Sequence, residues 1–219
     1  MLDFVDRLVQ CGVNLADAFD ICVDEAEWTY MQNHGFPRNG QVEASIMTAL
    51  SSDILLNYDR CLFHAAAVRY RDRAWLITGD SGVGKSTQAK NLQRILPGEF
   101  SVISGDRPVL QILESGEVMV HPSPWNGKEN WKGAPAALLG GIICLRRDSE
   151  NSVQRLSKRK AAIPVYIGLI QSGKAKSTIL QAAAFAERVI NACTIWQLNS
   201  FQVPDSTKLL FDTVFSGDN

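Results

Sequence analysis

The sequence predicts an α/β fold in which a β-sheet carries a phosphate-binding loop. The first observation is the short apolar and β-branched run 74–78, which is typical of a buried strand. Directly after it, in the segment 79–87, two glycines separated by four residues are followed by Lys-Ser, the Walker A pattern. The third observation is the helix-like stretch from Ser86 to Leu96, whose apolar residues fall on one face and which Pro97-Gly98 ends.

The first part of the chain predicts a helical hairpin. Leu2–Val9 and Leu15–Met31 have the apolar spacing of helices, and Gly12 interrupts them before Asn14, a plausible N-cap. A helix-turn-helix DNA reader is the alternative, but its acidic residues would repel phosphates. These acidic residues are Asp17, Asp20, Asp24, Glu25 and Glu27.

The stretch 35–40 is the best candidate for a linker, because its glycines and proline break the helical periodicity. We therefore expect a helical appendage over residues 1–40 and a nucleotide-binding domain over residues 41–219. A helix is expected from Val42 to Asn57. The run Cys61–Tyr70 reads as one strand, and 71–73 as a tight turn into the strand before the loop. Two adjacent antiparallel strands ahead of a Walker A pattern are unusual for standard P-loop proteins, whose sheet is parallel.

The remaining elements alternate as in an α/β domain. They are a buried strand at Gly141–Leu145, a basic helical stretch beginning at Ser157–Lys160, a helix from Ala182 to Ala192, a strand at Thr194–Leu198 and a closing helix from Ser206 to Phe215.

Length and charge limit the possible partners. A chain of 219 residues with 46% apolar residues can form one domain with a substantial core. Its net charge of -1 gives no reason to expect nucleic acid or an anionic membrane as a partner. No apolar run approaches the roughly 20 residues that span a bilayer, and the N-terminus lacks a signal-peptide pattern. We therefore expect a cytoplasmic protein.

The cysteines are scattered and odd in number, and none forms a Cys-x-x-Cys pair. We expect them to be small buried hydrophobic residues rather than disulfides or zinc ligands. They are Cys11, Cys22, Cys61, Cys144 and Cys193.

The Walker A segment predicts a nucleoside triphosphate site. Its glycines allow the backbone N–H groups and the positive end of the next helix to converge on a phosphate. Lys85 would reach the β and γ phosphates, and the Ser86 hydroxyl would ligate Mg²⁺. A glycine-rich turn without a ligand is the alternative. A second Gly-Lys pair, Gly173-Lys174, lacks the upstream glycine and strand and is interpreted as solvated loop. The predicted nucleotide-binding residues are Gly79, Asp80, Ser81, Gly82, Val83, Gly84, Lys85, Ser86 and Thr87.

Three segments together resemble one known family. The segments 63–68 (FHAAAV), 79–87 (GDSGVGKST) and 103–107 (ISGDR) resemble the catalytic domain of HPr kinase/phosphorylase and its shorter relatives, over roughly residues 45–219. The resemblance implies a fold related to the ATP-dependent phosphoenolpyruvate carboxykinases, with a mixed sheet and a P-loop. By analogy, it also allows a homo-oligomer.

The resemblance implies a catalytic set of His64, Lys85 and Asp106. The family usually has Asp-Asp where this chain has Gly105-Asp106, and Asp106 matches the second aspartate, the base toward the acceptor hydroxyl. A turn residue or a Mg²⁺ ligand is the alternative for Asp106. His64 would position the γ phosphate or donate to the acceptor oxygen, and a satisfied core histidine is the alternative.

The segment 121–135 is rich in proline and glycine but contains two tryptophans and two lysines. It also resembles the Pro-Trp-x-Gly-Lys-Glu stretch of short HPr-kinase-like proteins, so we interpret it as the rim of an active site. Lys128 would meet phosphate, and Glu129 would help Ser86 and Asp106 to hold Mg²⁺; a packed loop with solvated charges is the alternative. Arg146-Arg147 would offer a cation to the phosphoryl group or lie in solvent.

The sequence therefore predicts a kinase that uses ATP and Mg²⁺ to phosphorylate a hydroxyl. The Glu-Ile-Arg-Gly signature of the full-length enzymes is absent, which argues against HPr as the substrate. Shorter relatives act on hydroxyls of peptides, proteins or free serine, some of them in peptide modification. Two alternatives stay open. One is a regulatory or scaffold protein that binds nucleotide with little turnover, which Gly105 favours. The other is a carboxykinase-like enzyme of a small acid, for which the required Arg and Lys residues are not evident.

Overall fold

A nine-stranded mixed sheet forms the centre of the computed structural model, which describes residues 23–125, 127, 131 and 133–216. Seven strands run in the order β1-β5-β6-β7-β3-β2-β4, while β9 pairs with β7 and β8 pairs with β9. Only β3–β7 and β7–β9 are parallel among these pairs, so the sheet is mostly antiparallel. The strands are β1 (Arg60–Leu62), β2 (Ala65–Tyr70), β3 (Arg73–Thr78), β4 (Phe100–Ser104), β5 (Val109–Ile112), β6 (Val118–His121), β7 (Ala137–Arg147), β8 (Ser152–Arg155) and β9 (Thr194–Ser200).

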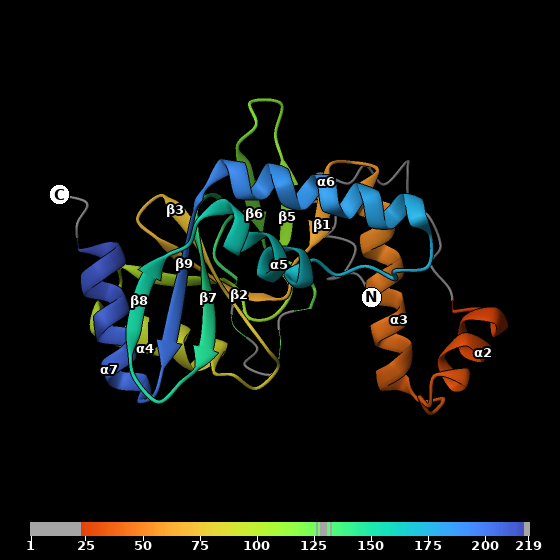
Figure 1. The fold of residues 1–219 in the computed structure, drawn as a ribbon, viewed down its shortest axis with the longest axis horizontal. Helices are drawn as coiled ribbons and strands as arrows, with labels where there is room; N and C mark the ends of the chain where they lie inside the picture. The colour runs from red at the N-terminus through yellow and green to blue at the C-terminus, as the bar shows by residue number, and fades with distance from the viewer. Residues whose placement is uncertain (1–22, 126, 128–130, 132, 217–219) are drawn as a thin grey trace.

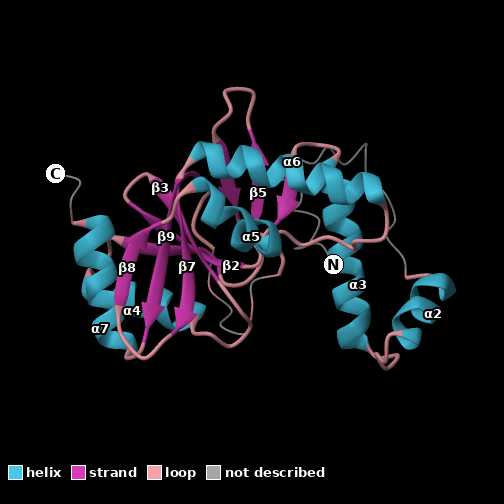
Figure 2. Cartoon of the chain, viewed as in Figure 1, coloured by secondary structure: helices cyan, strands magenta, loops and turns pink. Residues whose placement is uncertain are grey.

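Helices cover both faces of the sheet, as Figure 1 shows. Helices α5 and α6 pack on one face, and α4 and α7 pack on the other. In Figure 2 the strands β7, β8 and β9 stand side by side between these layers, and α2 and α3 lie at the opposite end of the molecule. The helices are α2 (Glu25–Asn33), α3 (Gly40–Leu56), α4 (Lys85–Ile95), α5 (Lys158–Gly168), α6 (Lys176–Ala192), α7 (Val203–Leu210) and the π-helical segment η2 (Phe211–Phe215).

Strand β3 is buried on both faces, and its alternating side chains enter two different cores. Ala74 and Leu76 belong to the cluster under α5 and α6, whereas Trp75 and Ile77 belong to the cluster under α4 and α7. The prediction of a mixed α/β fold with a buried strand at 74–78 is confirmed. Burial on both faces fixes the end of β3, from which the 79–87 loop begins.

The predicted single strand Cys61–Tyr70 is wrong at its centre, where the chain breaks into β1 and β2. Strand β1 pairs with β5, whereas β2 pairs with β3 and β4. Between them, Phe63 forms an isolated bridge with Leu169, and the N–H of His64 donates to the carbonyl of Gly168 over 2.7 Å. The apolar run gave no signal of this break, because both halves are buried. The break takes His64 out of the sheet ladder.

The N-terminal elements are only partly described. The predicted helix Leu2–Val9 and the cap at Asn14 lie outside the described residues. Helix α2 begins with a different cap, Asp24, whose carboxylate accepts from the N–H of Glu27. The predicted boundary near residue 40 stays a prediction; Asn39 caps α3 there, with its side chain accepting from two backbone N–H groups.

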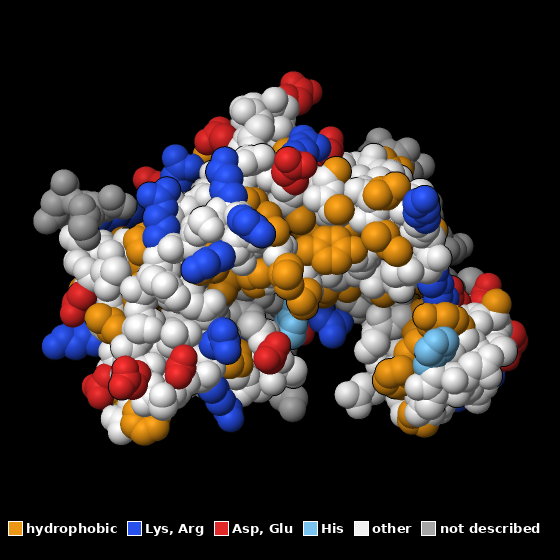
Figure 3. Space-filling view, viewed as in Figure 1, with side chains coloured by type: hydrophobic (Ala, Val, Ile, Leu, Met, Phe, Trp, Pro, Cys, Tyr) orange, Lys and Arg blue, Asp and Glu red, His pale blue; other side chains and the backbone are white. Residues whose placement is uncertain are grey.

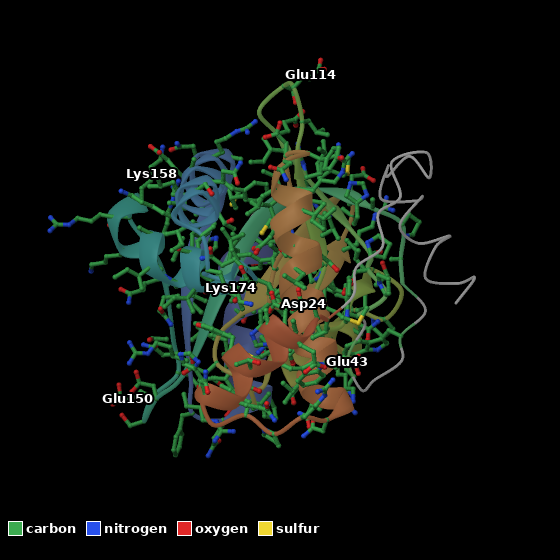
Figure 4. The ribbon with its side chains drawn as sticks, turned by 90° about the vertical axis from the view of Figure 1, so that its right-hand side faces the viewer. Asp24, Glu43, Glu114, Glu150, Lys158 and Lys174 are labelled. Atoms are coloured by element: carbon green, nitrogen blue, oxygen red, sulfur yellow. The ribbon has the colours of Figure 1, made fainter. Side chains whose placement is uncertain are left out.

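The interpretation of Gly173-Lys174 as a solvated loop is confirmed, since both residues are exposed in the loop before α6. The Lys174 ammonium pairs with Glu27 and also lies 4.8 Å from the centre of the Tyr30 ring. Figure 4 shows Lys174 next to α2. The loop before α6 therefore fastens α2 to the rest of the molecule.

The later elements follow the predicted order, with differences at their ends. Helix α6 begins at Lys176, six residues before its predicted start, and the closing helix changes at Phe211 into the wider η2 turn. Among the described residues, no helix is long and apolar enough to cross a membrane.

A glycine is required where β7 passes beneath Trp75. A Cβ built on Gly141 would lie 2.5 Å from Cζ3 of Trp75 and 2.9 Å from the carbonyl oxygen of Thr194. We predict that Gly141→Ala lowers the free energy of unfolding by about 1–3 kcal/mol, because the backbone of β9 cannot move away. Urea denaturation measures the change.

The matched control is Gly40→Ala at the start of α3, where an added Cβ meets nothing within 4 Å. It should leave stability unchanged or raise it by about 0.4–1 kcal/mol. Equal stabilities of the two variants would contradict the close packing of β3, β7 and β9.

Candidate active site

The 79–87 loop joins the end of β3 to the start of α4, as the sequence predicts. A Cβ on Gly79 would lie 2.4 Å from the carbonyl oxygen of Leu145, so only glycine lets the loop leave the sheet beside β7. Gly84 caps α4 with φ of 115°, a conformation that favours glycine, and it offers no capping side chain. The first N–H groups of α4 are therefore left for another acceptor, such as a phosphate.

The Lys85 side chain folds back onto the start of this loop. It comes from the first residue of α4, and its Nζ donates to the carbonyls of Gly79 and Asp80, each over 3.0 Å. The residue is only 9% exposed. Burial lowers the pKa of Lys85, an effect that the charges of Asp106 and Asp80 oppose. These carbonyls hold the ammonium where a phosphate on the loop would meet it.

A buried polar network holds α4 against α7 and β9. The Gln88 side chain donates to the Ser206 hydroxyl over 2.8 Å and accepts from Thr207 over 2.6 Å. The hydroxyls of Ser206 and Ser200 are 2.8 Å apart. Because each buried polar group has a partner, the network fixes the orientation of α4 and hence of the loop at its N-terminus. Isolated serines and threonines in the sequence gave no signal of it.

The end of β7 supports the loop from the other side. The Arg147 guanidinium donates to the carbonyl of Gly82 over 2.9 Å. A hollow of about 540 Å³ lies here, lined by Asp80, Ser81, Gly82, Val83, Arg146 and Arg147. The predicted Arg146-Arg147 pair thus lies beside the loop, and both residues are exposed.

His64 lies at the break between β1 and β2, with 35% of its side chain exposed. Its backbone is held at both ends, since its N–H donates to Gly168 and its carbonyl accepts from the Thr78 hydroxyl over 2.9 Å. Burial, followed by the charge of Lys85, lowers the pKa of His64. The lowered pKa favours the neutral ring, and His64 is not a core residue of a strand.

Asp106 follows β4 and faces His64. Its Oδ1 is 3.5 Å from Nε2 of His64, and its Oδ2 is 3.2 Å from Nε of Arg107. The backbone carbonyl of Asp106 accepts from the N–H of Ala65, the residue after His64. This bond places the two side chains side by side. The carboxylate is 31% exposed, so another molecule can reach it.

Arg107 is a site residue that belongs to the 103–107 segment but to which the sequence pattern assigned no role. Besides Asp106, its Nη1 donates over 2.8 Å to the hydroxyl of Thr48 on α3, and Thr48 is 1% exposed. Arg107 is also among the cations that lower the pKa of His64. It positions Asp106 by joining the carboxylate to a buried anchor. Only its position next to Asp106 in the sequence could have indicated this role.

The predicted rim of the site reaches Asp106 through its described residues. The Trp125 carbonyl accepts from the N–H of Arg107 over 3.2 Å, and a Cβ on Gly127 would lie 3.3 Å from that of Asp106. Lys128 and Glu129 lie outside the described residues, so their roles stay predictions.

Two described residues, Ser86 and Asp106, offer oxygen atoms for a Mg²⁺ ion that also binds phosphate. The described residues contain no group of three or more His, Cys, Asp or Glu residues suited to a metal ion. Mg²⁺ is commonly bound by one or two protein oxygens together with phosphates of the substrate. The Ser86 hydroxyl in the first turn of α4 and the Asp106 carboxylate offer such oxygens, and they fit a Mg²⁺ ion that arrives with a nucleotide.

A larger hollow, of about 650 Å³, opens between the loop and α5. We call it the α5 hollow. Its polar side contains His64, Gly79, Asp80 and Ser81, and its far wall is formed by residues of α5. Because Asp80, Ser81 and Arg146 also line the hollow beside Arg147, the two hollows share the loop. The loop therefore borders both hollows.

No protein-family model matches the chain, and no curated protein matches its sequence. Among solved structures, the chain is similar to the Hpr(Ser) kinase/phosphatase from Coxiella burnetii, with 12% sequence identity and a TM-score of 0.38. The match covers 69% of this chain and 94% of that chain. At this level of likeness, membership of the family that the three segments resemble stays a prediction, and function has to be inferred from the residues themselves.

We predict that the pKa of His64 lies below 6.5, its ordinary value. Arg107→Met should raise the pKa of His64, because it removes one of the cations that disfavour the imidazolium. As the pH falls, the variant ring should therefore become charged first. NMR titration of the ring protons measures both values, and His64→Gln assigns the signal among the three histidines.

Arg155→Met on β8 is the control, because it removes an arginine that has no part in the His64 shift. A wild-type pKa above 6.5, or equal values in wild type and Arg107→Met, would contradict the placement of Arg107 beside His64 and Asp106.

Proposed function

We propose that the chain is an ATP- and Mg²⁺-dependent kinase that transfers the γ-phosphoryl group to a hydroxyl, with the fold of the HPr kinase family. The observation that carries the proposal is the meeting of His64, Lys85 and Asp106. Lys85 lowers the pKa of His64, while Asp106 raises those of both His64 and Lys85. Nε2 of His64 lies 3.5 Å from Oδ1 of Asp106, and Lys85 is near enough for its charge to act on the His64 ring.

The two sides of the site suit the two halves of a phosphoryl transfer. The N-terminus of α4 and Lys85 would bind the β and γ phosphates, where negative charge gathers during the reaction. Asp106 lies next to His64, which lines the α5 hollow, and its other carboxylate oxygen pairs with Arg107. A hydroxyl bound in that hollow would lie between the phosphate and a carboxylate base.

In the proposed step, the acceptor hydroxyl oxygen attacks the γ-phosphorus of ATP. The bond from that phosphorus to the bridging oxygen breaks, and ADP leaves with the electron pair. The hydroxyl proton passes to Asp106. Mg²⁺, held by the nucleotide and the Ser86 hydroxyl, would neutralise phosphate charge when bound.

A second candidate is a nucleotide-binding regulatory protein with little turnover. The observation that favours it is Gly105, which replaces the first aspartate of the family pattern and leaves one carboxylate at this position. ATP binding without formation of ADP or of a phosphorylated product would favour this candidate, and Gly105→Asp would then be expected to raise turnover.

We predict that Lys85→Met weakens Mg·ATP binding by roughly 10- to 100-fold, because a charge-assisted contact with phosphate is lost. Lys176→Met at the exposed start of α6 is the matched control and should bind as wild type does. Isothermal titration calorimetry measures the affinities. Unchanged affinity in Lys85→Met would overturn the assignment of the loop.

Asp106→Asn should retain Mg·ATP affinity and lose transfer by roughly 10²- to 10⁴-fold, because the amide cannot accept the hydroxyl proton. Transfer from γ-labelled ATP to serine peptides is the readout. Asp72→Asn, in the exposed turn between β2 and β3, is the control. Loss of nucleotide binding in Asp106→Asn would instead make Asp106 chiefly a metal ligand.

A further inference from the structure

Two isoleucines on α5 are exposed where the helix borders the candidate active site. Ile163 is 70% exposed and Ile167 is 71% exposed, one helical turn apart. The opposite face of α5 is buried through Ala161 and Val165. Single exposed apolar residues are common, but a pair on the wall of a ligand-sized hollow is a surface suited to binding.

The isoleucines share the α5 hollow with His64 and the first residues of the 79–87 loop. The end of α5 is fixed against the chain at His64, because the Gly168 carbonyl accepts from the His64 N–H over 2.7 Å. A Cβ on Gly168 would lie 2.4 Å from Cζ of Phe63, so the helix can approach this closely only with glycine there. Ile163 and Ile167 thus line the α5 hollow together with His64 and the 79–87 loop.

The apolar surface continues beyond the α5 hollow. Ile163 also lines a groove of about 530 Å³ between α5 and α6, whose wall includes Ala162, Tyr166, Ala183 and Ile190. Figure 3 shows hydrophobic side chains gathered over these two helices. A molecule whose hydroxyl enters the α5 hollow can therefore place an apolar group on Ile163 and Ile167 or in the groove.

We infer that the acceptor is a polypeptide segment with an apolar side chain close to its hydroxyl-bearing residue, and that Ile163 and Ile167 determine this specificity. The inference rests on the proposed kinase function. Free serine is small and charged at both ends, and it would leave the isoleucines and the groove in water. A peptide with a leucine-like neighbour would bury them and gain the free energy of that burial.

The test uses short peptides with one central serine in an alanine and glycine background. In each, a single leucine occupies a different position relative to the serine; the background peptide without leucine and free L-serine complete the set. With wild type, we expect kcat/KM for at least one leucine peptide to exceed that for the background peptide by roughly tenfold or more.

Ile163→Ser and Ile167→Ser should abolish that preference without affecting Mg·ATP affinity. Because both side chains are exposed, the variants should fold. Phe36→Ser is the control, since Phe36 is also 50% exposed but lines neither the α5 hollow nor the groove. Equal use of free serine, the background peptide and the leucine peptides by wild type, or a preference that survives in both isoleucine variants, would overturn the inference and leave the kinase assignment intact.

A binding measurement separates this inference from the kinase assignment. If no probe is phosphorylated, fluorescence anisotropy with labelled peptides and Mg·ADP shows whether peptide binding still depends on leucine. Leucine-dependent binding that is lost in Ile163→Ser and Ile167→Ser would support the apolar site while the proposed kinase function fails. Binding that does not depend on leucine would overturn both.

Discussion

The break between β1 and β2 is the constraint on which the site depends. A continuous strand would keep His64 in the sheet ladder, with its side chain packed in the core. Instead its N–H bonds to the last residue of α5, and the next N–H, from Ala65, bonds to the carbonyl of Asp106. Two backbone hydrogen bonds thus bring three distant parts of the chain together. The same break fixes where α5 ends and therefore where its isoleucines face.

The charges around this point are arranged so that each group has a partner in the absence of nucleotide. Lys85 is held by two carbonyls of its own loop, and Asp106 lies between Arg107 and His64. A phosphate that bound Lys85 would draw its ammonium away from the carbonyls of Gly79 and Asp80. Because Asp80 is exposed, these carbonyls would not be left without a partner in an apolar core. The site is therefore kept in order before any ligand binds, which lowers the cost of binding.

The sequence predicted the helices and strands better than the contacts that bring the site residues together. The strand, loop and helix at 74–95 were predictable because periodicity and glycine spacing are local signals. The break at His64 was not, because its cause is a bond to Gly168, more than a hundred positions later in the chain. Arg107 was missed for a similar reason, since its anchor, Thr48, lies on a distant helix. The exposure of the α5 isoleucines depends on how α5 packs on the sheet, which the sequence of that one helix does not determine.

The most direct test of the central claim is a crystal structure of the protein with Mg²⁺ and a non-hydrolysable ATP analogue. The account predicts that the β and γ phosphates lie on the N-terminus of α4, and that Nζ of Lys85 leaves the carbonyls of Gly79 and Asp80 to contact them. The γ phosphate should face the α5 hollow beside Asp106. A nucleotide bound elsewhere, with Lys85 still on its two carbonyls, would contradict the account.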